Sequence, residues 1–354
     1  MSIADQINRL NNAKAAIKQS IKNKGVAVSD EAKLDEYPTL IDRIPTGEGG
    51  GSVSDELFYN ALTSNGTSYY YLFAHKTIDD SSFIESLDTS KVTDMSYAFL
   101  YFRSSSLDLS GWDISNVTKM TYMFNYCNIT NDIKIPPLNS KVTSLNSVFQ
   151  NCSCSSVIGL EEWDTKNITS LEYLFSEFKG NNVYGISNWD VSNVKYFGSL
   201  FRSCTNLTEI DISGWDTSNG TSFLTSIYPI IYGCSNLERV IGAIDMSNNN
   251  GKINYSATYA LTKGCSKLKE LRLINIYKNT PVKNEAGYSL YLQDTQIEDQ
   301  YLIEIIENLP DLINDKGLTA TNNLIIMLPP TNTLTQEQVQ VAIDKGWNVG
   351  NTTY

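Results

Sequence analysis

The feature that most constrains this chain is a repeat of 25 or 26 residues that recurs through its middle. Three columns stand out when the repeats are aligned. The first is Leu87, Trp112, Leu138, Trp163, Trp189 and Trp215; the second is Phe99, Phe124, Phe149, Phe175 and Phe201; the third is Phe102, Cys127, Cys152, Phe178 and Cys204. Self-similarity at a fixed period is typical of a solenoid, in which neighbouring coils bury one another's apolar side chains. The sequence therefore predicts an α/β solenoid whose core includes Trp112, Phe124, Cys127, Trp163, Phe175, Trp189, Phe201, Cys204 and Trp215.

Each repeat is expected to contain a short helical face followed by a short strand. Val117, Met120, Phe124 and Cys127 step by three, four and three residues, which places them on one side of a helix. Ser115 or Asn116 precedes this face, where a short polar side chain can cap a helix. Alternating apolar pairs predict strands that stack in parallel about 4.7–4.9 Å apart. These pairs are Leu107 with Leu109, Ile133 with Ile135, Ile210 with Ile212, and Leu271 with Leu273.

The repeat pattern W-D-x-S-N-V-T-x-M-x-x-M-F-x-x-C, followed by L-x-L, resembles the BspA-like subclass of bacterial leucine-rich repeats. The match is specific at residues 112–127, 163–178 and 189–212, and looser at 87–109 and 138–160. Residues 215–244 add residues after Thr221, and residues 245–276 lose the tryptophan. The resemblance covers roughly residues 83–350. It implies a leucine-rich-repeat solenoid used as a recognition surface, without chemistry of its own.

Composition shifts divide the chain into five predicted segments. These are an N-terminal helical module for attachment and oligomerisation (1–45), a glycine-rich linker (46–53), an N-terminal cap of the solenoid (54–86), the leucine-rich repeats (87–276), and enlarged C-terminal repeats that cap the other end (277–354). In the last segment, Thr295 with Glu298 and Thr335 with Gln338 have the spacing of capping boxes, so a helix is expected after each.

The N-terminal module contains a heptad seam. Ile at both core columns of such a seam favours a trimer, with a dimer also possible. The alternative is that the same face packs on residues 26–44 of its own chain. The seam residues are Ile3, Ile7, Leu10, Lys14, Ile17 and Ile21.

The same module resembles a segment at the start of many tailed-phage structural proteins. The shared features are a helix with K-A-A-I-K near its end, a G-V turn, and then L-D-E-Y and I. This resemblance implies that residues 1–45 dock on other virion proteins, in either the capsid or the tail.

Charge and hydropathy exclude several classes of protein. A net charge of −12 opposes binding to nucleic-acid phosphates and to anionic membrane surfaces. The start, MSIADQINRL, lacks the apolar core of a signal peptide, and no run approaches the ~18 apolar residues of a membrane span. We therefore expect no nucleic-acid partner, no membrane, and a virion protein assembled in the host cytoplasm.

The sequence offers no evident catalytic or metal site, so we expect no enzyme activity and no cofactor. His75 is the single histidine, and no CxxC pair occurs. A column shared by Cys and Phe indicates buried structural thiols. The acidic column repeats in nearly every unit, whereas a catalytic pair is needed once, so it is predicted to close a turn in each repeat. Its members are Asp88, Asp113, Asp164, Asp190 and Asp216.

Together these features predict a non-enzymatic phage virion protein, a head or tail fibre or capsid decoration. Its solenoid would bind host surface glycan or protein. The 21 tyrosines suit such a surface, because tyrosine contributes rigid amphipathic contact area. One alternative is a bacterial cell-surface adhesin of the BspA-like type. Another is a glycan-cleaving enzyme that uses two carboxylates. The choice between head and tail, and the ligand, stay open.

Overall fold

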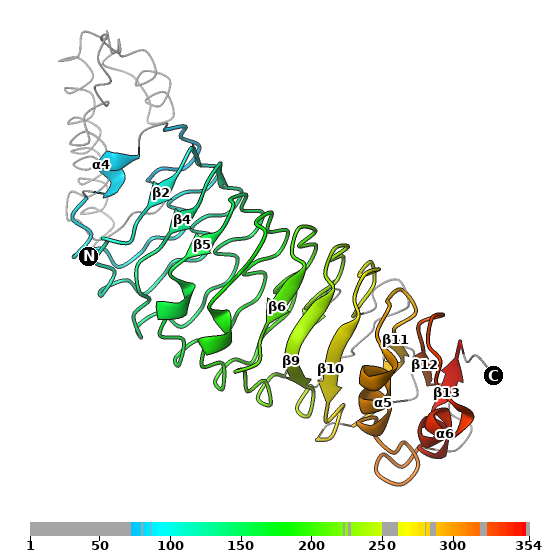
Figure 1. Cartoon of the computed structure of the whole chain (residues 1–354). Coiled ribbons are helices and arrows are strands. Elements are labelled where there is room, and N and C mark those ends of the chain that lie inside the picture. Colours follow the sequence, from blue (N-terminus) through cyan, green and yellow to red (C-terminus); the bar gives the residue numbers. More distant parts are fainter. Residues whose placement is uncertain are drawn as a thin grey trace, which may run out of the picture.

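The computed structural model describes residues 72–78, 81–85, 87–221, 224–225, 228–249, 261–279, 281–283, 288–318 and 324–351. They form an elongated solenoid in which most strands pair in parallel with the next coil (Figure 1). The heptad residues Ile3, Ile7, Leu10, Lys14, Ile17 and Ile21, the linker at 46–53 and residues 54–71 of the predicted cap lie outside the described residues.

Short strands pair coil to coil along the solenoid axis. One sheet contains β2 (Leu107–Asp108), β4 (Ile133–Lys134) and β5 (Val157–Ile158), and a second contains β6 (Glu209–Asp211), β9 (Arg239–Asp245) and β10 (Glu270–Ile274). A third contains β11 (Leu290–Tyr291), β12 (Ile325–Met327) and β13 (Asn348–Gly350), and β1 (Arg103–Ser104) pairs with β3 (Asn128–Ile129). The pair β7 (Leu224–Thr225) and β8 (Tyr228–Pro229) is antiparallel. The strands predicted at Leu107, Ile133, Ile210 and Leu271 are confirmed.

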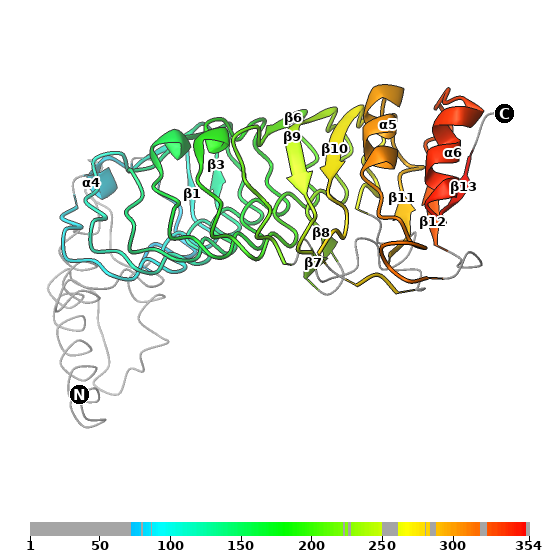
Figure 2. The same cartoon turned by 90° about the horizontal axis from the view of Figure 1, so that it is seen from below.

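Helices are few among the described residues. They are α4 (Ser82–Glu85), α5 (Asp299–Glu307) and α6 (Gln336–Asp344), with 3-10 turns η2 (Leu160–Glu162) and η3 (Ile186–Asn188). Helix α5 packs on β10 and α6 packs on α5, while β11, β12 and β13 lie towards the other side of the solenoid (Figure 2).

The two predicted capping boxes have different outcomes. The box at α6 is confirmed, because the Thr335 hydroxyl accepts from the Gln338 N–H and the Gln338 side chain accepts from the Thr335 N–H. The box at α5 is wrong. Glu298 occupies the N-cap, and the Thr295 hydroxyl donates instead to the Leu292 carbonyl at 2.7 Å.

The helix predicted within each repeat is also wrong. Residues 121–126 form consecutive tight turns, and their backbone N–H groups alternate in direction. The Met123 N–H donates to Met120 within the coil, whereas the Phe124 N–H donates to Val148 of the next coil at 2.8 Å. A tight turn returns the chain to the interior after three residues, so successive turns produce nearly the same apolar spacing as a helix. Asn116 caps no helix, since its side-chain amide donates to the Ser90 carbonyl of the preceding coil.

Aromatic side chains stack along the core from coil to coil. Six phenylalanine rings form one column, with centroids of successive rings 5.0–5.7 Å apart: Phe73, Phe99, Phe124, Phe149, Phe175 and Phe201. Trp163, Trp189 and Trp215 form a second column. The Trp189 indole N–H donates to the Leu160 carbonyl of the preceding coil at 2.8 Å. This pairing satisfies a polar group that burial would otherwise leave unpaired.

The cysteines of the chain are buried free thiols. Three of them bond to the preceding coil: the Cys204, Cys234 and Cys265 thiols each donate to a carbonyl there at 2.9 Å. Burial raises the pKa of Cys152, so this thiol stays protonated. These side chains therefore act as small core residues.

The predicted role of the acidic column is confirmed, because each carboxylate accepts from the backbone N–H two residues later. Asp190 accepts from the Ser192 N–H at 3.0 Å and from the Ser192 hydroxyl at 2.6 Å. These two bonds hold the pKa of Asp190 below its usual value. Asn139 replaces Asp in one repeat and accepts from the Lys141 N–H in the same way.

Substitution of Trp189 should separate hydrogen bonding from packing. Trp189→Phe keeps much of the ring but removes the indole bond to the Leu160 carbonyl, which still accepts from the Trp163 N–H, so we expect a loss of about 0.5–1.5 kcal/mol in the free energy of unfolding. Trp189→Ala should lose about 3–5 kcal/mol because it also opens a cavity. Guanidinium unfolding followed by circular dichroism measures both. A Phe variant as stable as the wild type would show that the indole bond contributes nothing.

The acidic column also predicts a pH dependence of stability. The pKa of Asp190 is lowered on folding, so its contribution is present above the unfolded value of 3.8 and is lost as pH falls through the lower folded value. Asp190→Asn keeps the acceptor but cannot titrate. Unfolding curves between about pH 5 and pH 2 should therefore fall less steeply for this variant. Parallel curves for the two proteins would contradict the prediction.

Candidate functional site

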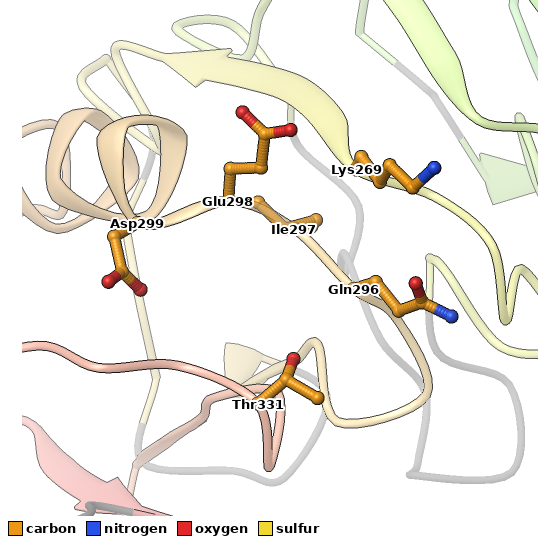
Figure 3. Close-up of a pocket in the computed structure, with 6 residues that line it drawn as sticks. All are labelled: Lys269, Gln296, Ile297, Glu298, Asp299 and Thr331. Carbon is orange, nitrogen blue, oxygen red and sulfur yellow. The ribbon is translucent and has the colours of Figure 1, made fainter.

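A cavity of about 370 Å³ near the C-terminal end is lined by Lys269, Gln296, Ile297, Glu298, Asp299 and Thr331 (Figure 3). Its polar groups already have structural partners. Lys269 pairs with Glu238 at 3.1 Å, Gln296 donates to the Ser266 carbonyl, and Asp299 accepts from the Thr333 N–H. The side chains of Glu298 and Asp299 point in different directions. The cavity therefore does not present two carboxylates facing a common point, as glycoside cleavage needs.

A different surface is built by the turns of the repeat. Each coil between residues 97 and 203 has two turn residues in a left-handed conformation, with φ of 54–59°, and the N–H of the second one donates to the next coil. Tyr101 donates in this way to Asn125, and Tyr126 donates to Gln150, both at 3.0 Å. Because the position recurs once per coil, its side chains form a column on the outside of the solenoid. The described members are His75, Tyr101, Tyr126, Asn151, Glu177, Ser203, Gly233 and Gly264.

The first three members of this column are aromatic and stack on one another. Ring centroids lie 4.9 Å apart for His75 and Tyr101, and 4.7 Å apart for Tyr101 and Tyr126. Tyr101 and Tyr126 are 42% and 45% exposed, so their edges face solvent. Tyr97 and Tyr122 form a second stacked pair in the preceding left-handed column, with centroids 4.8 Å apart.

A polar column runs directly beside the first aromatic one. Phe102 and Cys127 point into the core, and the next residues, Arg103 and Asn128, point out again. Thr77, Arg103 and Asn128 are partners in parallel β pairing, and all three are exposed. We call the six exposed residues of the two columns the aromatic face: His75, Thr77, Tyr101, Arg103, Tyr126 and Asn128.

The backbone conformation at Tyr101 and Tyr126 favours glycine over tyrosine. A left-handed conformation disfavours a residue with a Cβ by about 1–2 kcal/mol, and glycine escapes this penalty. Later coils use glycine at the same position, at Gly233 and Gly264. Tyr101 and Tyr126 thus occupy positions where a glycine would be less strained. The left-handed conformation recurs in other coils, so the distinguishing feature of this end is that large aromatic side chains occupy it and are exposed, which makes the aromatic face the candidate binding surface.

The residues predicted from sequence lie elsewhere. The nine predicted core residues, from Trp112 to Trp215, are all buried inside the solenoid. Within the described ranges, no group of three or more His, Cys, Asp or Glu residues is placed to hold a metal ion, and no helix is long and apolar enough to cross a bilayer. The aromatic face is not among the sites predicted from the sequence. The signal was present, because His75, Tyr101 and Tyr126 are spaced by the repeat length.

Substitution of Tyr126 by glycine should show whether the aromatic face is structural. The lost stacking of about 0.5–1.5 kcal/mol is offset by release of the left-handed strain, so the free energy of unfolding should change by less than about 1 kcal/mol. Phe124→Gly in the core of the same coil should cost more than about 3 kcal/mol. Chemical denaturation of both variants is the measurement. If Tyr126→Gly proves as damaging as Phe124→Gly, the tyrosine serves the fold.

Comparisons with curated proteins and with solved structures give no match for this chain. A family described as Mycoplasma protein of unknown function, DUF285, matches residues 59–153 and 143–255. The two matches overlap and together span residues 59–255 of the 354, which is more than half of the chain. The chain therefore belongs to the DUF285 family.

Proposed function

We propose that this chain is a non-enzymatic recognition protein whose solenoid binds glycan or protein on a cell surface through the aromatic face. The observation that carries the proposal is the exposure of Tyr101 and Tyr126 at strained positions of the fold. Tyrosine edges offer apolar contact and a hydroxyl together, with little side-chain entropy to lose on binding.

The rigidity of the solenoid supports this role. Each coil is held to the next by backbone bonds, and the rings of the aromatic face are stacked on one another before any ligand arrives. A surface that is ordered in advance loses less conformational entropy when it binds. The repeat pattern resembles BspA-like leucine-rich repeats, and this resemblance also implies a recognition surface.

The proposed setting is a tailed-phage virion, where the chain would be a head or tail fibre or a capsid decoration. The support is the resemblance of residues 1–45 to phage attachment segments. In this setting the seam from Ile3 to Ile21 assembles an oligomer, with a trimer favoured, and docks it on capsid or tail proteins. The solenoid then projects towards the host.

A bacterial surface adhesin is the second candidate. It is favoured by the family description, which names Mycoplasma, a cellular organism. In both candidates the aromatic face binds the ligand. They differ in whether the solenoid is attached to a virion or to a bacterial cell.

Two measurements test the proposal. Fluorescent full-length protein should bind host cells, and Tyr101→Ser with Tyr126→Ser should reduce this binding at least tenfold, because each central aromatic contact contributes on the order of 1–2 kcal/mol. Tyr184→Ser is the matched control, because Tyr184 is 73% exposed and lies outside the aromatic face. Equal binding by all three proteins would reject the aromatic face as the contact.

Immunogold electron microscopy with antibody against residues 54–354 then identifies the carrier. Gold on the capsid or the tail of purified particles supports the virion setting and chooses between head and tail. Gold on the cell envelope, with none on particles, rejects the virion setting and supports the adhesin.

A further inference from the structure

The arginines of the solenoid are distributed in a way that singles out one of them. The described part of the chain contains four, and three are paired with carboxylates on neighbouring coils. Arg202 lies 2.7 Å from Glu177, Arg239 lies 2.9 Å from Glu270, and Arg272 lies 2.7 Å from Glu304. Among the described residues, Arg103 has no carboxylate partner, and its side chain is exposed. In a chain with a net charge of −12, an unneutralised arginine is notable.

Arg103 lies in the middle of the aromatic face. In the polar column it sits between Thr77 and Asn128, and the aromatic column with Tyr101 and Tyr126 runs alongside. Neither column contains an acidic residue in the coils from His75 to Ser153. The neighbours of Arg103 in the two columns therefore carry hydroxyl, amide and aromatic groups. The planar fork of the Arg103 guanidinium suits a carboxylate or a sulfate.

The backbone around Arg103 argues against an added peptide strand as the ligand. Strand β1 pairs with β3 on one side, and Thr77 bridges to Arg103 on the other, so no open sheet edge is offered to a partner strand. The spacing is also unsuitable. Same-face side chains of an extended peptide recur about every 6.5 Å, whereas the aromatic rings recur every 4.7–4.9 Å. A ligand read only by side chains, with many hydroxyls of its own, fits this surface better.

We propose that the aromatic face binds an acidic glycan, with a carboxylate or sulfate group on Arg103 and sugar rings against Tyr101 and Tyr126. Thr77 and Asn128 supply hydrogen bonds to sugar hydroxyls on either side of the charged group. The inference rests on the proposed recognition function and specifies its ligand class.

The test uses full-length protein and three immobilised polysaccharides of similar length: a polyuronate, a sulfated polysaccharide and a neutral one. Wild-type protein should bind at least one acidic polysaccharide at least tenfold more tightly than the neutral one. Arg103→Gln should lose about tenfold or more of this affinity, because a charge-assisted bond is removed. Arg103→Lys should recover only part of it, since an ammonium lacks the planar fork. The preferred acidic polymer identifies the charged group as carboxylate or sulfate.

Lys195→Gln is the matched control, because it makes the same charge change at an exposed cation on a later coil. Equal losses for Lys195→Gln and Arg103→Gln would show attraction to overall charge and would overturn the assigned site. Equal binding of neutral and acidic polysaccharides would overturn the acidic class.

The inference and the proposed function fail in different ways. If host cells bind the protein through Tyr101 and Tyr126 but no polysaccharide does, the ligand is not a glycan and only the inference fails. If neither cells nor polysaccharides bind, the recognition function itself is rejected.

Discussion

The structure depends on one backbone interaction, the hydrogen bond from alternate N–H groups of each turn to the coil that follows. In residues 121–126, one set of N–H groups closes turns within the coil, and the other set reaches the next coil. A single coil cannot satisfy its own backbone, so it is stable only within the stack. Parallel strands, stacked phenylalanines and asparagine amides such as that of Asn116 continue the same coupling elsewhere in the repeat.

This bonding pattern also determines where surface chemistry can appear. At the position of Tyr101 and Tyr126, the turn residue combines a left-handed conformation with an N–H that donates to the next coil, and its side chain lies outside the core. The solenoid thus presents the same outward position once per coil. Glycine fills it at Gly233 and Gly264, whereas Tyr101 and Tyr126 fill it near the N-terminal end. The side chain at that position differs from coil to coil while the core columns are kept, so the surface can change without a change in the core.

The arginines of the solenoid differ in their surroundings. Arg202, Arg239 and Arg272 each pair with a glutamate on a neighbouring coil. Exposed pairs of this kind contribute little stability each. At the aromatic face Arg103 lies in columns of tyrosine, threonine and asparagine, and it has no carboxylate partner among the described residues. The different surroundings of one residue type are the basis for assigning an acidic ligand to this end.

The sequence by itself determined the solenoid, the repeat length, the buried columns from Trp112 to Trp215 and the turn-closing role of Asp190 and its equivalents. Each of these depends on which residues recur at a fixed spacing, and spacing is visible in the sequence. The tertiary structure alone decided that the segment from Val117 to Cys127 is no helix and that residues 121–126 within it form consecutive turns. Tight turns and helices share the three-to-four residue period, and only the direction of each N–H distinguishes them. It also decided that His75, Tyr101 and Tyr126 stack beside Arg103, because contacts between coils depend on how the coils are superposed.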